Sequence, residues 1–264
     1  STVSMWNQFK KKEKKIKFYS LLPAVNTLHP ITPARKFRRK WVQEEKEFFV
    51  EHEKKCPLHL KTGLTSVGRC PAIKTTMHTG YIVYAPADFT INTIGDGQEL
   101  NVTHRHVLEH APYVDTHADW QSEWVLPTNA PCVNKVVKLN LPWRLLTNDH
   151  DIIFLITAVQ YHPEERFTQL TGLMDPLITS EINCQLAWHV MDDTVTVLAG
   201  TPLAQIIPMS REALSWDVDI CDATPRLIDL EREMIYAGQH QFGSDYKEKV
   251  NNMAKILKKY GFDD

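Results

Sequence analysis

The chain lacks the residue patterns that mark many enzyme classes. Glycine accounts for only 10 of its 264 residues. None of these glycines forms the Gly-x-Gly-x-x-Gly turn of dinucleotide-binding proteins or a Walker loop. No serine lies in the Gly-x-Ser-x-Gly elbow of α/β-hydrolases. The sequence therefore carries no signature of a nucleotide-dependent or serine-dependent enzyme, although a catalytic cleft built from dispersed residues would leave none.

Cysteines and long apolar runs are also scarce. The five cysteines are widely spaced, odd in number and never form Cys-x-x-Cys, which argues against a disulfide framework and a Cys-rich zinc site. We expect their thiols to act as small apolar residues in a reducing compartment. No apolar run approaches the roughly 20 residues of a membrane helix, and Phe9–Phe18 is mostly lysine with no apolar h-region behind it. The sequence predicts a protein that is neither membrane-bound nor secreted.

Charge is distributed unevenly along the chain. Residues 1–55 hold 14 Lys and Arg against 6 Asp and Glu, whereas the remaining residues hold 16 against 26. Such a basic arm can dock on nucleic acid or on an acidic protein, or it can stay solvated or fold back on its own acidic body. The candidate partner-binding residues of the arm are Lys10, Lys11, Lys12, Lys14, Lys15, Arg35, Arg38 and Arg39.

From Gly80 onward, short apolar runs alternate with polar turns, as in antiparallel β domains. Gly95-Asp96-Gly97 is typical of a hairpin turn, because glycine reaches positive φ without a Cβ clash. Further strands are predicted at Asn134–Leu141, Ile152–Ala158, Phe167–Leu173, Ile182–Val190, Thr194–Leu198 and Leu203–Pro208. Strands at this spacing, with no helices between them, predict a mainly β fold: an antiparallel sandwich, jelly roll or β-clip-like barrel.

Helices are predicted at both ends of this β region. Thr32-Pro33 predicts a helix start, with Phe37, Trp41 and Phe48 on one face and an end near Lys55. Thr224-Pro225 and Ser244-Asp245 predict two more helices. The expected organisation is a basic arm and amphipathic helix over 1–60, a β domain over 61–215 and a helical appendage over 216–264.

Several blocks together resemble an uncharacterised protein family of marine bacteriophages, including cyanophages. The matching pieces are Arg69-Cys70-Pro71, Thr79-Gly80-Tyr81-Ile82, Pro86-Ala87-Asp88, Leu141-Pro142-Trp143-Arg144, Leu173-Met174-Asp175 and the run from Gly200 to Arg211. They cover roughly residues 65–215. The resemblance implies a phage setting but lends no catalytic residues.

The block around Ala204-Gln205-Ile206 is also similar to the end of the barrel in the dUTPase and dCTP-deaminase superfamily. There a turn glycine precedes a strand with an apolar-Gln-apolar triplet, as Gly200 does here. The resemblance implies a compact β-barrel or β-clip topology. It does not imply the activity, because the chain has no clear uracil-pocket motif and no Gly-rich phosphate-binding arm.

One cluster has the composition of a metal site. His104, His106, His110 and His117 lie close together in sequence, and His-x-His on a strand places both imidazoles on one face. With a carboxylate they would form a cupin-type site for iron, manganese or zinc. The alternative is a group of surface histidines in a long loop, since the later strands offer only His189 as a companion. If the histidines are surface residues, the sequence predicts no cofactor.

Tryptophans form a second candidate group. Trp143 ends a predicted strand before Arg144, and Trp188 alternates with Leu186 and Cys184, as residues on a core face do. Trp120 and Trp124 lie four apart in an irregular segment and are predicted to make exposed partner contacts.

The first functional hypothesis is a non-enzymatic phage protein: a virion component or protein-interaction module that contacts itself or other phage proteins, in the host cytoplasm and in the virion. The second is a cupin-like or dUTPase-like small-molecule enzyme that uses the His104–His117 cluster. The third is a host-directed regulator whose basic arm binds an acidic cytoplasmic partner.

Overall fold

The structure is a computed structural model, and it describes residues 13–55, 67–96, 99–122, 124–126, 135–240 and 246–262. Predictions for Lys10, Lys11, Lys12, Cys56 and Cys132 fall outside these ranges. The chain divides into two compact units, Ser1–Leu214 and Ser215–Asp264, and each is described by itself. Within the described residues, no helix is both long and apolar enough to span a membrane.

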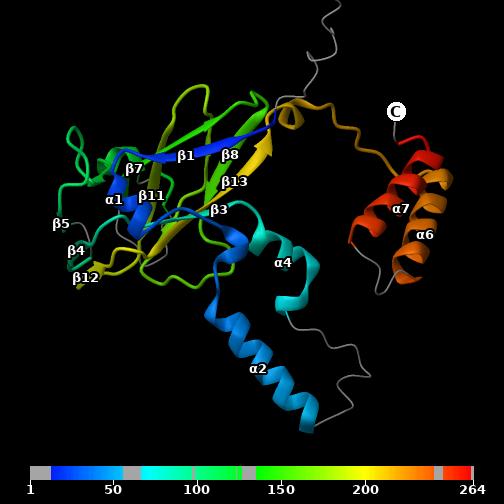
Figure 1. Cartoon of the computed structure of the whole chain (residues 1–264), viewed down its shortest axis with the longest axis horizontal. Coiled ribbons are helices and arrows are strands. Elements are labelled where there is room, and N and C mark those ends of the chain that lie inside the picture. Colours follow the sequence, from blue (N-terminus) through cyan, green and yellow to red (C-terminus); the bar gives the residue numbers. More distant parts are fainter. Residues whose placement is uncertain are drawn as a thin grey trace, which may run out of the picture. The chain divides into compact units, whose positions relative to one another are not determined.

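The first unit is built from three antiparallel sheets, which confirms the mainly β prediction (Figure 1). Sheet A has the order β1 (Ile16–Ser20), β7 (Val136–Thr147), β11 (Glu181–Trp188) and β9 (Phe167–Gln169), and β6 (Val114–Thr116) also pairs with β7. Sheet B has the order β10 (Gly172–Met174), β8 (Ile152–Thr157), β13 (Pro202–Ser210), β3 (Tyr81–Tyr84) and β2 (Thr32–Pro33). Sheet C has the order β12 (Thr194–Val197), β4 (Phe89–Ile94) and β5 (Glu99–His104).

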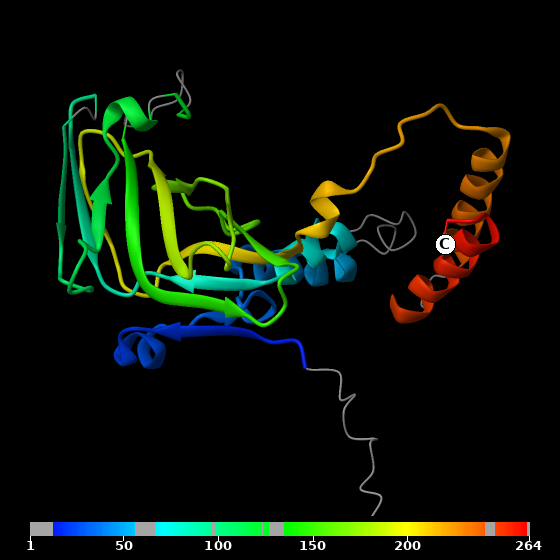
Figure 2. The ribbon, with the colours of Figure 1, turned by 90° about the horizontal axis from the view of Figure 1, so that it is seen from above.

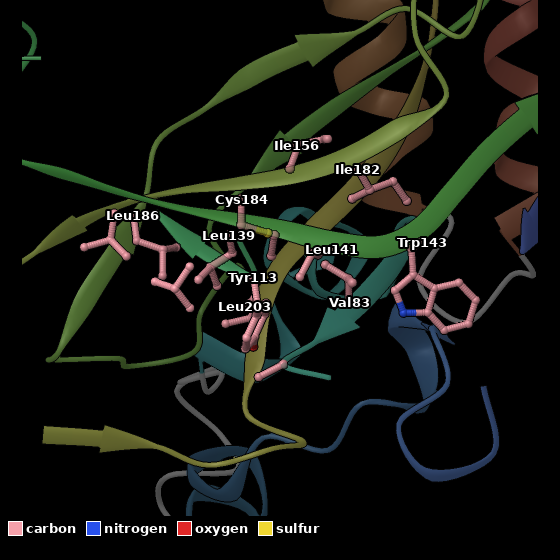
Figure 3. Packing of buried hydrophobic residues seen from close by; sticks show 14 of the residues in the cluster. Val83, Tyr113, Leu139, Leu141, Trp143, Ile156, Ile182, Cys184, Leu186 and Leu203 are labelled. Carbon is pink, nitrogen blue, oxygen red and sulfur yellow. The ribbon is translucent and has the colours of Figure 1, made fainter. Parts of the chain in front are cut away.

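The core lies between the inner faces of these sheets (Figures 2 and 3). Alternate residues of β7 and β11 point inward, including Leu139, Leu141 and Ile182. Trp143 and Trp188 are fully buried, as predicted from their places in strands. Cys184 is buried in the same cluster, and burial raises the pKa of its thiol to about 12, so it packs as a small apolar residue.

The helices are short or peripheral. In the first unit they are α1 (Pro23–Leu28), α2 (Lys40–Lys55), α4 (Pro71–His78) and α5 (Asp119–Ser122). Short 3-10 turns are η2 (Ala34–Lys36), η3 (Val67–Arg69) and η4 (Glu212–Ser215), and the boundary between the two units falls within η4. The second unit holds α6 (Pro225–His240) and α7 (Tyr246–Lys259). α6 begins at the predicted Thr224-Pro225, and Gly261, at φ +78°, follows α7 as a C-terminal cap.

One predicted helix start is wrong. Thr32-Pro33 forms strand β2, which pairs with Tyr81 and Ile82, and the long helix begins only at Lys40. Tertiary contacts outweigh the local signal, because the Thr32 hydroxyl bonds the Tyr84 hydroxyl at 2.7 Å. Phe37 therefore precedes the helix and packs against the ring of His162.

The Leu141-Pro142-Trp143-Arg144 block marks an irregularity in the central strand β7. The pairing with β11 shifts between Glu181, opposite Arg144, and Asn183, opposite Asn140. A proline has no N–H for the ladder and is tolerated in a strand interior at such a bulge. Arg144 Nη1 donates to the carbonyls of Leu141 and Trp143, at 3.1 and 3.0 Å. The arginine thus satisfies backbone groups at the irregularity, which is a physical reason for this residue order.

Two other sequence blocks meet in an ion pair. Arg211, at the end of β13, holds Asp175 through both carboxylate oxygens, with Nη2 at 2.6 Å from Oδ1. The Arg211 guanidinium lowers the pKa of Asp175 from its ordinary 3.8 to about 2. The pair ties the loop after β10 to the end of sheet B.

This pKa shift predicts an acid-dependent contribution to stability. Because the folded-state pKa lies below the unfolded one, the contribution is complete above about pH 4 and is lost as pH falls toward 2. Asp175→Asn should therefore lower the urea midpoint at neutral pH, and the difference from wild type should vanish near pH 2. Arg211→Gln should show the same profile, and the double variant should add little. A deficit that stays constant from neutral to acidic pH would contradict this assignment.

Candidate functional site

The outer face of sheet A carries a groove formed by two adjoining cavities. The larger, of about 560 Å³, lies over β7 and β11 beneath Leu21, Leu22 and the loop 107–111. The smaller, of about 270 Å³, extends over β11 and β9 to strand β10 and the turn 175–179 that follows it. Glu181 and Asn183 line both cavities. We call this surface the sheet A groove.

The register of β7 and β11 determines the groove floor. Residues of these strands alternate between the core and the outer face, so the outer positions form cross-strand pairs. The pairs are Glu181 with Arg144, Asn183 with Asn140, and Gln185 with Lys138. The floor is therefore polar, whereas aliphatic residues contribute to both walls: Leu21, Leu22, Val107 and Leu108 on one side, and Leu170, Leu173 and Ile178 on the other.

The two asparagines at the centre of the floor differ in their hydrogen bonding. Asn140 Nδ2 donates to the Pro112 carbonyl at 2.7 Å, which orients its amide. Asn183 is half-buried, and its amide makes no hydrogen bond with any residue in the described ranges. A side-chain amide has both donors and acceptors. Asn183 thus has free hydrogen-bonding capacity in a groove.

Charge at the groove is nearly balanced. Arg144 is largely buried, and its Nη2 lies 3.5 Å from Glu181 Oε1. Its Nη1 is already engaged by the two β7 carbonyls. Glu109 and His110, which lie 3.7 Å apart at the rim, are highly exposed. Such a site suits a ligand that exchanges hydrogen bonds with amides more than one of strong charge.

The four predicted metal ligands are not brought together into a metal site. Among the residues that the structure describes, no group of three or more His, Cys, Asp or Glu side chains is placed to hold a metal. His104 Nδ1 lies 2.9 Å from the Arg105 carbonyl, His106 is exposed, and His110 pairs with Glu109. His117 Nε2 lies 2.7 Å from Gln185 Oε1, at the end of the groove floor. His117 thus orients a floor residue.

The described residues of the basic arm differ in their contacts and exposure. Lys14 Nζ pairs with Asp149 at 2.6 Å, so the arm contacts its own β domain there. Lys15, Arg35 and Arg38 are exposed. Their predicted partner contacts stay predictions.

Arg39, by contrast, is only 5% exposed. Its Nε donates to the Gln160 carbonyl at 2.8 Å, and its guanidinium lies over the Phe37 ring at 5.2 Å. Burial lowers its pKa. With this packing Arg39 positions the start of α2 on the β domain and does not face solvent.

Trp120 and Trp124 are both largely exposed, as are several aliphatic residues elsewhere. Sequence patterns missed the groove, since its residues come from strands far apart in the chain and their types are ordinary. The available signal was the polar set Lys138, Asn140 and Arg144, which alternates with buried residues along β7. That alternation identifies an outer face but not a hollow one.

No protein-family model and no curated protein matches the chain. Among solved structures, the native dUTPase of EIAV is similar to part of it. The two share 12% sequence identity and a TM-score of 0.30, over 55% of this chain and 85% of the dUTPase. A likeness this weak carries no argument about activity.

Proposed function

We propose that the chain is a non-enzymatic protein-interaction module whose sheet A groove holds an extended segment of a partner protein. The observation that carries this proposal is the central pair of the groove floor. Asn183, whose amide bonds none of the described residues, lies opposite Asn140, between walls of aliphatic side chains. An extended backbone presents N–H and C=O groups in alternation, and side-chain amides can bond both kinds.

The walls define the chemistry of the segment. Leu21, Leu22 and Val107 on one side, and Leu173 and Ile178 on the other, offer apolar surface to side chains that leave the backbone in opposite directions. A strand-like peptide with aliphatic or aromatic residues at alternate positions fits this arrangement. The near balance of Arg144 and Glu181 disfavours a highly charged segment.

In this proposal the interaction module is a structural component of a phage particle. The sequence blocks between residues 65 and 215 support that setting, because together and in the same order they resemble a protein family of marine bacteriophages. We expect mass spectrometry of gradient-purified particles to find the protein in a constant number of copies per particle.

The groove itself is tested with a library of short peptides selected on the full chain. We expect enriched peptides to alternate apolar residues. Asn183→Ala should weaken their binding about three- to tenfold, because a hydrogen bond contributes roughly 0.5–1.5 kcal/mol. Asn101→Ala, which removes an exposed asparagine of β5, should leave binding unchanged. Titration calorimetry with a selected peptide measures the difference.

Two results would contradict the proposal. Selected peptides that bind Asn183→Ala as tightly as wild type would show that the groove is not the binding site. Hydrolysis of dUTP, or of another small substrate, by the purified chain would overturn the non-enzymatic assignment.

A further inference from the structure

The segment that joins the two units has the pattern of an unpaired strand. Trp216, Val218 and Ile220 alternate with Asp217 and Asp219. The three apolar side chains are 65, 78 and 91% exposed, although alternation of this kind is typical of a half-buried strand. Within the described part of the chain, this segment pairs with no strand. We call residues 216–220 the acidic strand segment.

Strand β1 offers the complementary edge. It lies at the margin of sheet A and pairs only with β7 among the described strands (Figure 2). Ile16 and Phe18 pack against the core, and Lys15 and Lys17 point to solvent. No other edge strand in the described ranges carries a lysine. Lysines on an edge discourage pairing with another basic strand, but they favour an acidic one.

From this complementarity we infer that the acidic strand segment of one copy adds to the free edge of β1 in a second copy. In an antiparallel register that places Asp217 opposite Lys17, Asp219 lies opposite Lys15. The same register places Trp216 opposite Phe18 and Val218 opposite Ile16. Charged and apolar pairs therefore form together, each on its own side of the extended sheet.

The chain's own geometry favours a second copy over self-pairing. The Arg211 N–H bonds the Asp151 carbonyl at 2.6 Å, and Lys14 pairs with nearby Asp149, so the chain leaves the β domain beside the beginning of β1. Antiparallel pairing within one chain would require the segment first to run along β1, roughly 17 Å for five strand residues, and then to reverse. Parallel pairing is the less stable ladder. A second copy can approach in the antiparallel direction.

This surface is separate from the sheet A groove, so the inference does not depend on the function proposed above. The groove variant Asn183→Ala should therefore associate like wild type. Each proposal can fail while the other stands.

The test is a charge exchange followed by sedimentation equilibrium of the full chain. Wild type should associate in a concentration-dependent way. Asp217→Lys/Asp219→Lys and Lys15→Glu/Lys17→Glu should each weaken self-association about tenfold or more, because every strand contact then pairs like charges. All four positions are exposed, so circular dichroism should show both variants folded.

An equimolar mixture of the two variants restores opposite charges at both reciprocal contacts. Association should therefore recover in the mixture, which self-pairing within a chain cannot explain. Glu231→Lys/Glu248→Lys, an equal charge change on the exposed faces of α6 and α7, should associate like wild type. A monomeric wild type at all concentrations, or a mixture that stays dissociated, would overturn the inference.

Discussion

Replacing Gly80 by alanine is expected to destabilise the β domain by more than about 3 kcal/mol, or to prevent folding. Gly80 has φ +77°, and a Cβ there would lie 2.0 Å from the Ile206 carbonyl oxygen and 3.1 Å from the Ile207 Cα. Both atoms belong to the backbone of β13, which is held between β3 and β8. Relief would require β13 to shift within sheet B.

A matched variant separates this clash from the cost of the backbone conformation. Gly95 has φ +60°, but a Cβ there meets no atom within 4 Å. Gly95→Ala should cost only about 1–2 kcal/mol, the penalty of the left-handed conformation. Urea unfolding, together with the yield of soluble protein, measures both variants. An equal loss of unfolding free energy at the two positions would show that β13 shifts enough to accommodate the alanine.

Gln205→Leu is expected to lower the free energy of unfolding by about 3 kcal/mol or more. Gln205 is fully buried, and its Nε2 donates to the carbonyls of Thr76 and Thr79, at 2.8 and 2.7 Å. Its Oε1 accepts from the Gln160 N–H at 3.0 Å. Leucine has a similar volume but removes the partner of the Thr79 carbonyl and of the Gln160 N–H, and among the described residues it leaves the Thr76 carbonyl only a 3.4 Å bond from the Thr79 N–H.

Gln43→Leu provides the control, because Gln43 is exposed on α2 and its side chain bonds, among the described residues, only Glu47 of the same helix. It should change stability by no more than about 0.5 kcal/mol. Gln205→Glu should cost at least as much as Gln205→Leu, since a carboxylate would face two carbonyl oxygens in the core. A Gln205→Leu variant within about 1 kcal/mol of wild type would show that this network contributes little to stability.

The Gln205 network also explains a sequence block that periodicity alone interprets poorly. The polar residue between Ala204 and Ile206 would be predicted to point outward from the strand. The structure buries it, because α4 and the loop after β8 cover that face and offer backbone groups as partners. Neither partner is near Gln205 in sequence, so the pairing is invisible before folding.

The sequence by itself determined the local features of this protein. Alternation in Phe89–Ile94 predicts a strand, since burial on one sheet face repeats every second residue. Short apolar runs bounded by polar turns predict the strands at Ile152–Thr157 and Pro202–Ser210. The same reasoning placed Trp143 and Trp188 in the core. Pro225 and Gly261 mark helix ends, because their backbone preferences are intrinsic.

Only the tertiary structure decided which strands are neighbours and what lies between them. Strand order depends on long-range contacts, such as β7 with both β1 and β11, that no local propensity encodes. Tertiary contacts also place Thr32-Pro33 in a strand, bury Arg39 and bring Asp175 to Arg211. They place Asn183 opposite Asn140 in a groove and leave β1 with a basic edge. Local energies select elements, whereas the burial and hydrogen bonding of distant residues select their arrangement.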